Sequence, residues 1–541
     1  MALPLVLGSV IIIACILSNK VASRFGIPML FAFILLGMLC GSDGMLGIEF
    51  DDYKIAEQVC SIALIFIMFY GGFGTRWKAA RPVAAQSILL SSAGVVITCG
   101  LTGVFCRFAL DMAWLEGLLI GAVLSCTDAA SVFSVLRSRR LSLKYNTDSM
   151  LEVESGSNDP WAYMLTSVIL SLMNGSADPL GVVWMVFSQI TFGLAFGAGI
   201  ALATGWFLRH FRFGADGFNA AFMIAVAVLS YALPTLIGGN GYLSAYIVGI
   251  VLGNQQLPDK KSLVHFFDGL TSLMQMLIFF ILGLLSFPSL LPQVVVPAVL
   301  IALFLALVAR PAAVMAILIP FRSGIRQQTV VSVAGFRGAS SIVFAIMATV
   351  GSSSLQSDVF HIVFLVVLLS ISIQGTLLPL ISRRLDMINI EGDVLKTFND
   401  YTEEAAMQFI RLPVEAGHPW IGIQVRSLPL PPDTLLIFIR RTGRSVVPDG
   451  GTVIRLGDEL ILGAAAYRDD GKIKLTELSV DEEHEWCGKR VSQLGLPREV
   501  LIIFIRRGTK TVIPRGNTKI RPGDLLVLNE NAVDPTAPAP L

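Results

Sequence analysis

Apolar stretches alternate with short polar loops along the first 385 residues. Most of the stretches are long enough for a helix that crosses roughly 30 Å of hydrocarbon, although the ninth is short. We therefore predict thirteen transmembrane spans, near residues 2–18, 27–41, 56–72, 83–107, 113–136, 149–173, 180–208, 217–237, 241–253, 265–287, 293–320, 327–350 and 359–382. The pattern predicts an all-α polytopic membrane domain over 1–385.

The charges of the loops test that count independently. If every second loop is assigned to the cytoplasm, these loops contain Lys20, Arg24, Arg76, Lys78, Arg81, Arg137, Arg139, Arg140, Lys144, Arg209, Arg212, Lys260, Lys261, Arg322, Arg326, Arg383 and Arg384. The opposite loops and their flanks contain only Lys54 and Arg107. The positive-inside rule then places the N-terminus outside and the C-terminus in the cytoplasm.

Composition supports a membrane protein, since 54% of the 541 residues are hydrophobic and only 15% are charged. The net charge of +1 indicates no particular partner, and we expect lipid but no nucleic acid as a partner. The seven cysteines have the spacing neither of a disulfide framework nor of a metal site. The N-terminus lacks a basic region before its apolar run, so we expect a first span there and no signal peptide.

The chain after Arg384 becomes polar and then repeats itself. HPWIGIQVRSLPLP at 418–431 aligns with HEWCGKRVSQLGLP at 484–497, and IFIRR at 437–441 recurs at the same offset of 66 residues. Short β-branched runs between Gly and Pro turns indicate a compact α+β module. We predict a linker with a short amphipathic helix at 386–405, repeats at 406–470 and 471–530, and a disordered end at 531–541.

Carboxylates interrupt one of the spans. The segment EVESGSNDPWAY (152–163) contains Glu152, Glu154 and Asp159. Charged groups inside a membrane are rare, face a cavity or a partner, and mark ion or proton paths. Asp159 is therefore a candidate ion-coupling residue. The alternative is that it makes a polar contact between helices or lies at the membrane surface.

A second acid and a cation lie in two other spans. Asp128, in LLIGAVLSCTDAASVFSVL (118–136), is surrounded by small and polar residues that disfavour a continuous helix. It is a second candidate for the ion site, unless it caps a helix or pairs locally. Arg337, in VAGFRGASSIVFAI (333–346), needs a carboxylate partner because an unpaired guanidinium in hydrocarbon is costly.

The Asn158-Asp159 pair, preceded by Glu154, resembles the motif of monovalent cation:proton antiporters of the NhaP/NHE type, over residues 1 to about 385. The resemblance implies inverted repeats and a helix that unwinds at Thr127-Asp128 to cross its repeat partner. GFRGA resembles the family's glycine-arginine-glycine motif, which implies an ion pair of Glu154 with Arg337 and leaves Asp159 free to exchange. Arg310 is a rival partner for Glu154.

The resemblance also implies a mechanism in which Asp159 carries either a proton or a desolvated Na⁺ or K⁺. The further oxygen ligands would come from Ser155, Asp128 and the Thr127 carbonyl. Asn158, where relatives with another stoichiometry have a second acid, implies electroneutral exchange. One departure is Tyr70, which stands before a Gly-Gly pair where many relatives have an acid. A phenol there would weaken Na⁺ binding and favour K⁺.

The duplicated module resembles the RCK-C or TrkA-C regulatory domain of potassium channels and transporters. The resemblance implies dimerisation and a regulatory ligand such as a cyclic dinucleotide. The paired arginines Arg440, Arg441, Arg506 and Arg507 could grip its phosphates or could be solvated strand ends.

We therefore predict a secondary antiporter of the cell membrane that is a homodimer, needs no cofactor and exchanges K⁺ or Na⁺ for H⁺. The alternative is a ligand-gated cation channel, against which the chain has no TVGYG-like filter. An intramembrane enzyme would need a motif such as H-E-x-x-H or G-x-S-x-G, and the spans have neither.

Overall fold

The structure is a computed structural model in which the chain divides into two units, Met1–Thr402 and Glu403–Leu541. It describes residues 2–25, 29–128, 131–132, 136, 141–176, 178–211, 216–255, 257, 260–352, 354–389, 407–431, 434–441, 444–465, 475–481, 484–496, 500–507, 510–512 and 514–530. Most of the predicted linker, the predicted join between the repeats and the predicted disordered end lie outside the described residues. The predicted domain boundaries stay predictions.

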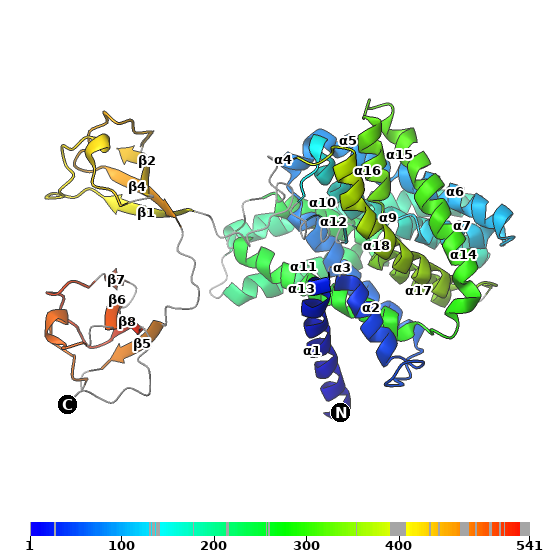
Figure 1. Ribbon diagram of the computed structural model, residues 1–541, viewed down its shortest axis with the longest axis horizontal. Coiled ribbons are helices and arrows are strands. Elements are labelled where there is room, and N and C mark those ends of the chain that lie inside the picture. Colours follow the sequence, from blue (N-terminus) through cyan, green and yellow to red (C-terminus); the bar gives the residue numbers. More distant parts are fainter. Residues whose placement is uncertain are drawn as a thin grey trace. The chain divides into compact units, whose positions relative to one another are not determined.

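In the first unit, every regular element that the structure describes is helical (Figure 1). The elements are α1 (Ala2–Phe25), α2 (Met29–Cys40), α3 (Tyr53–Gly74), α4 (Trp77–Ala80), η1 (Arg81–Val83), α5 (Ala84–Ser91), α6 (Ala93–Ala109), α7 (Trp114–Val123), η2 (Lys144–Asn146), α9 (Thr147–Met173), α10 (Pro179–His210), α11 (Asp216–Leu236), α12 (Gly241–Gly253), α13 (Lys260–Leu285), α14 (Leu291–Phe304), η3 (Leu305–Ala309), α15 (Arg310–Leu318), α16 (Ile325–Val333), α17 (Ala339–Gly351) and α18 (Val359–Arg384).

Among the residues that the structure describes, seven helical stretches are long and apolar enough to cross a membrane. They are α3, the run from α4 to α6, α10, α11, α13, the run from α14 to α15, and α18. Five further apolar helices have only 10–17 described residues. The helical membrane domain is thus confirmed, while the count of thirteen spans stays a prediction because several predicted spans are short or interrupted helices.

Glycines bring α3 and α12 into backbone contact. A Cβ atom on Gly72 would lie 2.3 Å from the carbonyl oxygen of Tyr246, and one on Gly249 would lie 2.1 Å from that of Phe69. Small residues of this kind let membrane helices approach closely. The contact places α12 against α9, where Asn240 Nδ2 donates to the Pro160 carbonyl oxygen at 2.8 Å.

Two interrupted helices meet inside the unit. The chain leaves helical conformation after Val123 and again between α16 and α17. At the crossing, Asp128 N donates to the Phe336 carbonyl oxygen at 2.9 Å. A Cβ atom on Gly338 would lie 2.3 Å from the Asp128 Cβ, so the crossing needs a glycine. The interruption expected at Thr127-Asp128 is therefore present, while the inverted-repeat symmetry stays a prediction.

The segment before α9 pairs with the segment after α18. Leu143 and Ile388 form an antiparallel bridge, and Lys144 N donates to the Met387 carbonyl oxygen at 2.8 Å. The Lys144 ammonium also lies 2.9 Å from Asp386 Oδ2. The start of α9 is thereby attached to the residues that lead out of the helical unit.

The described part of the tail forms two four-stranded antiparallel sheets, with strand orders β1-β4-β2-β3 and β5-β8-β6-β7. The strands are β1 (Met407–Pro413), β2 (Thr434–Arg441), β3 (Arg444–Val446), β4 (Glu459–Ala465), β5 (Leu475–Val480), β6 (Val500–Arg507), β7 (Lys510–Val512) and β8 (Asp524–Glu530). The register shifts between Leu436 and Phe438 in the first sheet and between Ile502 and Phe504 in the second. These irregularities are at equivalent positions, so the duplication seen in the sequence is a duplication of structure.

Candidate functional site

Helix α9 places Ser155, Asn158 and Asp159 together because residues three and four apart share one face of a helix. All three side chains are buried. The next residue, Pro160, has no N–H to donate, so the carbonyl of Gly156 lacks its usual helical donor. The buried face of α9 therefore offers hydroxyl, amide, carboxylate and backbone oxygens at one level of the helix.

This face contacts the first interrupted helix through Thr127. The Ser155 hydroxyl donates to the Thr127 carbonyl oxygen at 2.6 Å, and Asn158 Nδ2 donates to Thr127 Oγ1 at 2.6 Å. The carbonyl is available because the chain has left helical conformation there. Three of the residues expected at the ion site, Thr127, Ser155 and Asn158, are thus in direct contact.

The carboxyl group of Asp159 contacts the second interrupted helix. Only 3% of the residue is exposed, and Ser340 Oγ at the start of α17 donates to Oδ2 at 2.5 Å. Oδ1 is buried and accepts no hydrogen bond from the described residues. Asp159 therefore lies between both helix breaks with one oxygen that can still take a proton or a cation.

Asp128 lies at the crossing itself and is half-buried. Its Oδ2 accepts a hydrogen bond from Ser131 Oγ at 2.5 Å. Local pairing of this kind is the alternative to a role for Asp128 as an ion ligand. The role of Asp128 in the ion site stays a prediction.

The expected ion pair between Glu154 and Arg337 is wrong. Glu154 Oε1 lies 2.5 Å from Arg310 Nη1, with side-chain exposures of 1% and 4%. Arg337 instead donates from Nη1 to the carbonyl oxygens of Ser125 and Cys126, at 3.0 and 2.8 Å. The carbonyl groups freed at the end of α7 take up the guanidinium that was expected to need a carboxylate.

A π-helical turn precedes the true partner of Glu154. The turn, η3, ends directly before Arg310 and joins α14 to α15. Such turns shift the helix face on which the following side chains lie and often mark functional sites. The sequence signals a kink through Pro311, but it does not show which way the kink turns Arg310.

Sequence reasoning missed two further residues of the site. Ser340 stands three residues after Arg337 and has no distinctive motif, and Asn240 stands at the start of the short helix α12. The sequence identifies Tyr70 only as a departure from the family pattern, without a partner for its hydroxyl. The hydroxyl donates to Asp268 Oδ1 at 3.2 Å, so an acid from α13 lies beside the position where relatives were expected to have one.

In the tail, the second arginine of each pair binds a buried aspartate. Arg441 donates from Nε and Nη2 to the two oxygens of Asp458, both at 2.7 Å, and Arg507 binds Asp524 in the same way at 2.7 and 2.6 Å. Burial by itself raises the pKa of both carboxyl groups, but the arginine and backbone hydrogen bonds outweigh it and lower the pKa below the ordinary value.

The first arginine of each pair is exposed instead. Arg440 Nη1 lies 3.6 Å from Glu459 Oε2, and 58% of the Arg440 side chain is exposed. Among the four arginines expected to hold a ligand, Arg440 and Arg506 therefore present their guanidinium groups to solvent, and Arg441 and Arg507 hold the sheets together.

Comparison with known proteins gives consistent matches. The transmembrane region of the sodium/hydrogen exchanger family matches residues 9–384, and the TrkA-C domain matches 409–464 and again 475–532. The K(+)/H(+) antiporter NhaP2 of Shewanella sp. (strain ANA-3) is 34% identical over 467 residues, which are 84% of this chain and 80% of that protein. The K(+)/H(+) antiporter NhaP of Alkalimonas amylolytica is 32% identical over 465 residues, 85% of this chain and 80% of that protein.

A solved structure has the same fold. The sodium proton antiporter MjNhaP1 from Methanocaldococcus jannaschii at pH 8 superimposes with a TM-score of 0.64 and 25% sequence identity. The match covers 71% of this chain and 99% of that one.

Proposed function

The chain belongs to the sodium/hydrogen exchanger family, and from that membership we propose that it exchanges a monovalent cation, K⁺ or Na⁺, for H⁺ across the cell membrane. It is a secondary transporter and no enzyme. The observation that carries the proposal is the position of the buried carboxylate of Asp159. It accepts a hydrogen bond from Ser340 at the second interrupted helix, and its neighbours on α9 bind Thr127 at the first.

The proposed exchange is a competition for one carboxylate. A dehydrated K⁺ or Na⁺ prefers oxygen ligands, which Asp159, the Ser155 hydroxyl and the Thr127 carbonyl supply within one cluster. A proton on Asp159 removes the negative charge that holds the cation, and the cation in turn keeps the proton away. Both occupants need the same oxygen atoms, so the site holds one of them at a time. The cation is therefore released on the side where a proton can bind, and the proton on the side where a cation can bind.

The charges around the site support electroneutral exchange. Glu154 and Arg310 neutralise each other within their salt bridge. Asn158 is neutral and holds Thr127, so Asp159 is the group on this face of α9 that changes occupant. One monovalent cation replaces one proton, and the net charge of the site is the same before and after.

The preferred cation in this proposal is K⁺. The names of the two sequence relatives and the neutral phenol of Tyr70 support it, since K⁺ costs less to dehydrate than Na⁺ and needs fewer charged ligands. Asp268, which accepts the Tyr70 hydrogen bond, is exposed and belongs to another helix, so it does not replace a buried acid on α3.

We further propose that the N-terminus lies outside, that the tail is cytoplasmic and that two copies form a dimer. The distribution of Lys and Arg in the loops supports the orientation. The exposed apolar side chains of α1, which extends from the edge of the helical unit in Figure 1, offer a surface for the second copy. Each TrkA-C domain would bind a regulatory ligand, and the exposed Arg440 and Arg506 would contact its phosphate groups.

The test is a proton-flux titration in proteoliposomes with a trapped pH indicator. Native protein should change the internal pH only when K⁺ or Na⁺ is supplied, and Asp159→Asn should abolish the change while eluting as folded protein. Asp148→Asn is a matched control because Asp148 is a buried acid on the same helix whose side chain contacts Ser142. Exchange retained by Asp159→Asn would refute the assignment, and cation flux without proton flux would favour the channel.

A further inference from the structure

His361, near the start of α18, is a buried histidine that the exchange proposed above does not use. Only 2% of the residue is exposed. Its ring lies between those of Phe360 and Phe287, with centroid distances of 5.1 and 6.0 Å. Phe287 belongs to residues 286–290, which join α13 to α14 and which we call the α13–α14 loop. The imidazole is therefore enclosed between this loop and α18.

Both ring nitrogens of His361 have partners whose roles are fixed. Nδ1 lies 2.6 Å from Asp358 Oδ2, and Nε2 lies 3.1 Å from the backbone nitrogen of Phe287. A backbone N–H can only donate, so Nε2 is the acceptor and carries no proton. A carboxylate can only accept, so the proton is on Nδ1. The two contacts therefore define a neutral imidazole of one tautomer.

Asp358 connects the buried ring to water. It is the N-cap of α18, and its Oδ1 accepts a hydrogen bond from the backbone N–H of His361 at 3.1 Å. Burial by itself raises the pKa of this carboxyl group, but the hydrogen bonds from His361 outweigh it and lower the pKa below the ordinary value. The carboxylate is thus charged in the pH range in which histidine side chains titrate. Its side chain is 38% exposed, which gives protons a route to the pair.

Other titratable groups reach this end of the helical unit from neighbouring elements. Tyr53 of α3 lies close enough to Asp358 and Asp51 for charge interactions with both. Glu116 of α7 accepts a hydrogen bond at 2.7 Å from the residue directly before Asp358. Asp43, which follows α2, accepts two hydrogen bonds from the α13–α14 loop, at 3.0 and 2.5 Å. These acidic neighbours favour a positive charge on the imidazole, and the Phe287 N–H opposes it.

We propose that His361 is a pH switch that holds the α13–α14 loop against α18 while its imidazole is neutral and releases the loop when a second proton binds. A proton on Nε2 would place two N–H donors against each other at the 3.1 Å contact with Phe287. That bond must then break, whereas the bond to Asp358 becomes charge-assisted and stays. A buried N–H without an acceptor is costly, so the ring and the loop separate until water bonds both groups.

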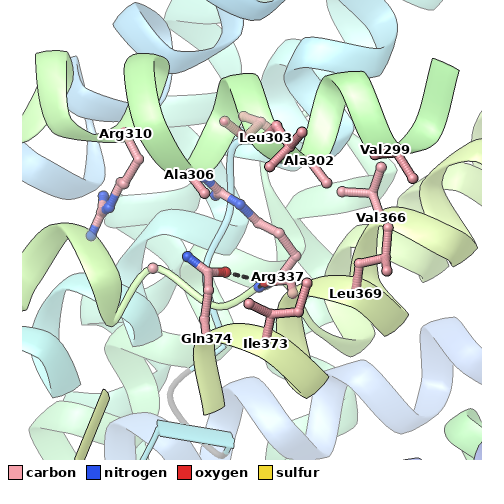
Figure 2. A pocket seen from close by; sticks show the side chains of 13 residues that line it. Val299, Ala302, Leu303, Ala306, Arg310, Arg337, Val366, Leu369, Ile373 and Gln374 are labelled. Atoms are coloured by element: carbon pink, nitrogen blue, oxygen red, sulfur yellow. Dashed lines mark hydrogen bonds between the residues drawn. The ribbon is translucent and has the colours of Figure 1, made fainter. Parts of the chain in front are cut away.

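The helices on either side of the loop have room to respond. A cavity of about 120 Å³ lies between α18 and the run from α14 to α15, with Leu303 and Ile373 on opposite sides (Figure 2). The same run leads from the loop to Arg310, the partner of Glu154 on α9. In the orientation proposed above, the loop and the start of α18 lie outside, so the switch responds to external acid. Proton binding to His361 does not depend on antiport, so it is measured separately from transport.

The test is hydrogen exchange of the Phe287 amide in the full-length protein in nanodiscs, at about pH 8 and about pH 5. Rates are corrected for the intrinsic pH dependence of amide exchange. In native protein, protection should fall about tenfold at the lower pH, the loss of one hydrogen bond. His361→Gln keeps an oxygen that can accept the Phe287 N–H and takes up no proton, so its protection should be equal at both pH values. His210→Gln is the matched control, since His210 is exposed and contacts the Trp206 carbonyl group. This variant should behave as native protein.

A second variant tests the charge that favours the imidazolium. Asp358→Asn keeps a side-chain oxygen at the helix cap and removes the negative charge, so release of the loop should shift by about one pH unit to lower pH. Equal protection of Phe287 in native protein at both pH values would overturn the proposal. A fall in protection that His361→Gln shares, or a release pH that Asp358→Asn leaves unchanged, would overturn it as well, because another group would then be the sensor.

Discussion

The salt bridge between Glu154 and Arg310 should be worth more to the folded protein than any contact of Glu154 with Arg337. Glu154→Gln keeps the size of the side chain and removes its charge. Arg310 would then remain charged and buried without a carboxylate partner. Its other nitrogens would not compensate, since they have no hydrogen-bond partner among the described residues. Removing one member of a buried pair costs about 3–5 kcal/mol.

The size of the effect follows from the geometry. With Nη1 and Oε1 2.5 Å apart, the two charges attract each other by about 7 kcal/mol at an effective dielectric constant of about 20, and the cost of removing both groups from water offsets part of this attraction. Arg310→Met should destabilise by a similar amount, since it leaves the Glu154 carboxylate alone. The double variant should recover most of the loss, because it removes both charges together.

The assay is a double-mutant cycle on the free energy of unfolding in detergent, with Arg337→Met as the comparison. The loss of Arg337 removes its bonds to the Ser125 and Cys126 carbonyl groups, so its cost should add to that of Glu154→Gln. A coupling energy larger for Arg337 than for Arg310 would refute the reasoning and restore the pairing expected from the sequence. So would a Glu154→Gln variant as stable as native protein.

Two further predictions concern the proposed cation site and the tail. Ser340→Ala removes the donor to Asp159 Oδ2 and should raise the KM for the cation about tenfold in the proton-flux assay. The control is Ser341→Ala, which should change the KM little because the Ser341 hydroxyl contacts Cys126. An unchanged KM in Ser340→Ala would contradict the assigned contact. Asp458→Asn should destabilise its sheet by about 1–3 kcal/mol, measured by hydrogen exchange of β2 and β4 peptides in the full-length protein. Because the folded-state pKa of Asp458 is lowered, its contribution should be complete above about pH 4 and disappear as the pH falls through that lowered value; protection that is the same in native and variant protein at pH 7 would contradict this.

Much of the architecture could be predicted because it depends on local patterns. Long apolar runs indicate membrane helices, and the repeated IFIRR string indicated the duplicated tail. The grouping of Ser155, Asn158 and Asp159 follows from helical spacing alone. The break at Thr127 could be expected from the small residues around it, together with the family resemblance.

The partners across the bundle could not be predicted in the same way. Arg337 binds backbone carbonyl groups and not a carboxylate because of where the carbonyl groups of a broken helix point. Which face of α15 carries Arg310 depends on the π turn before it. Ser340 was missed because a single serine among small residues gives no signal until the two breaks are brought together. These contacts join segments far apart in the sequence, and no local periodicity encodes them.

The antiparallel bridge between Leu143 and Ile388 has a mechanical consequence. Helix α9 begins at Thr147, and Asp159 lies about 18 Å along it from that residue, directly before Pro160. A displacement of about 1 Å in residues 386–389 would be transmitted along α9 and move the Asp159 carboxylate by a similar distance. A movement of segment 386–389 would therefore shift Asp159, the proposed exchanging group, whatever causes the movement.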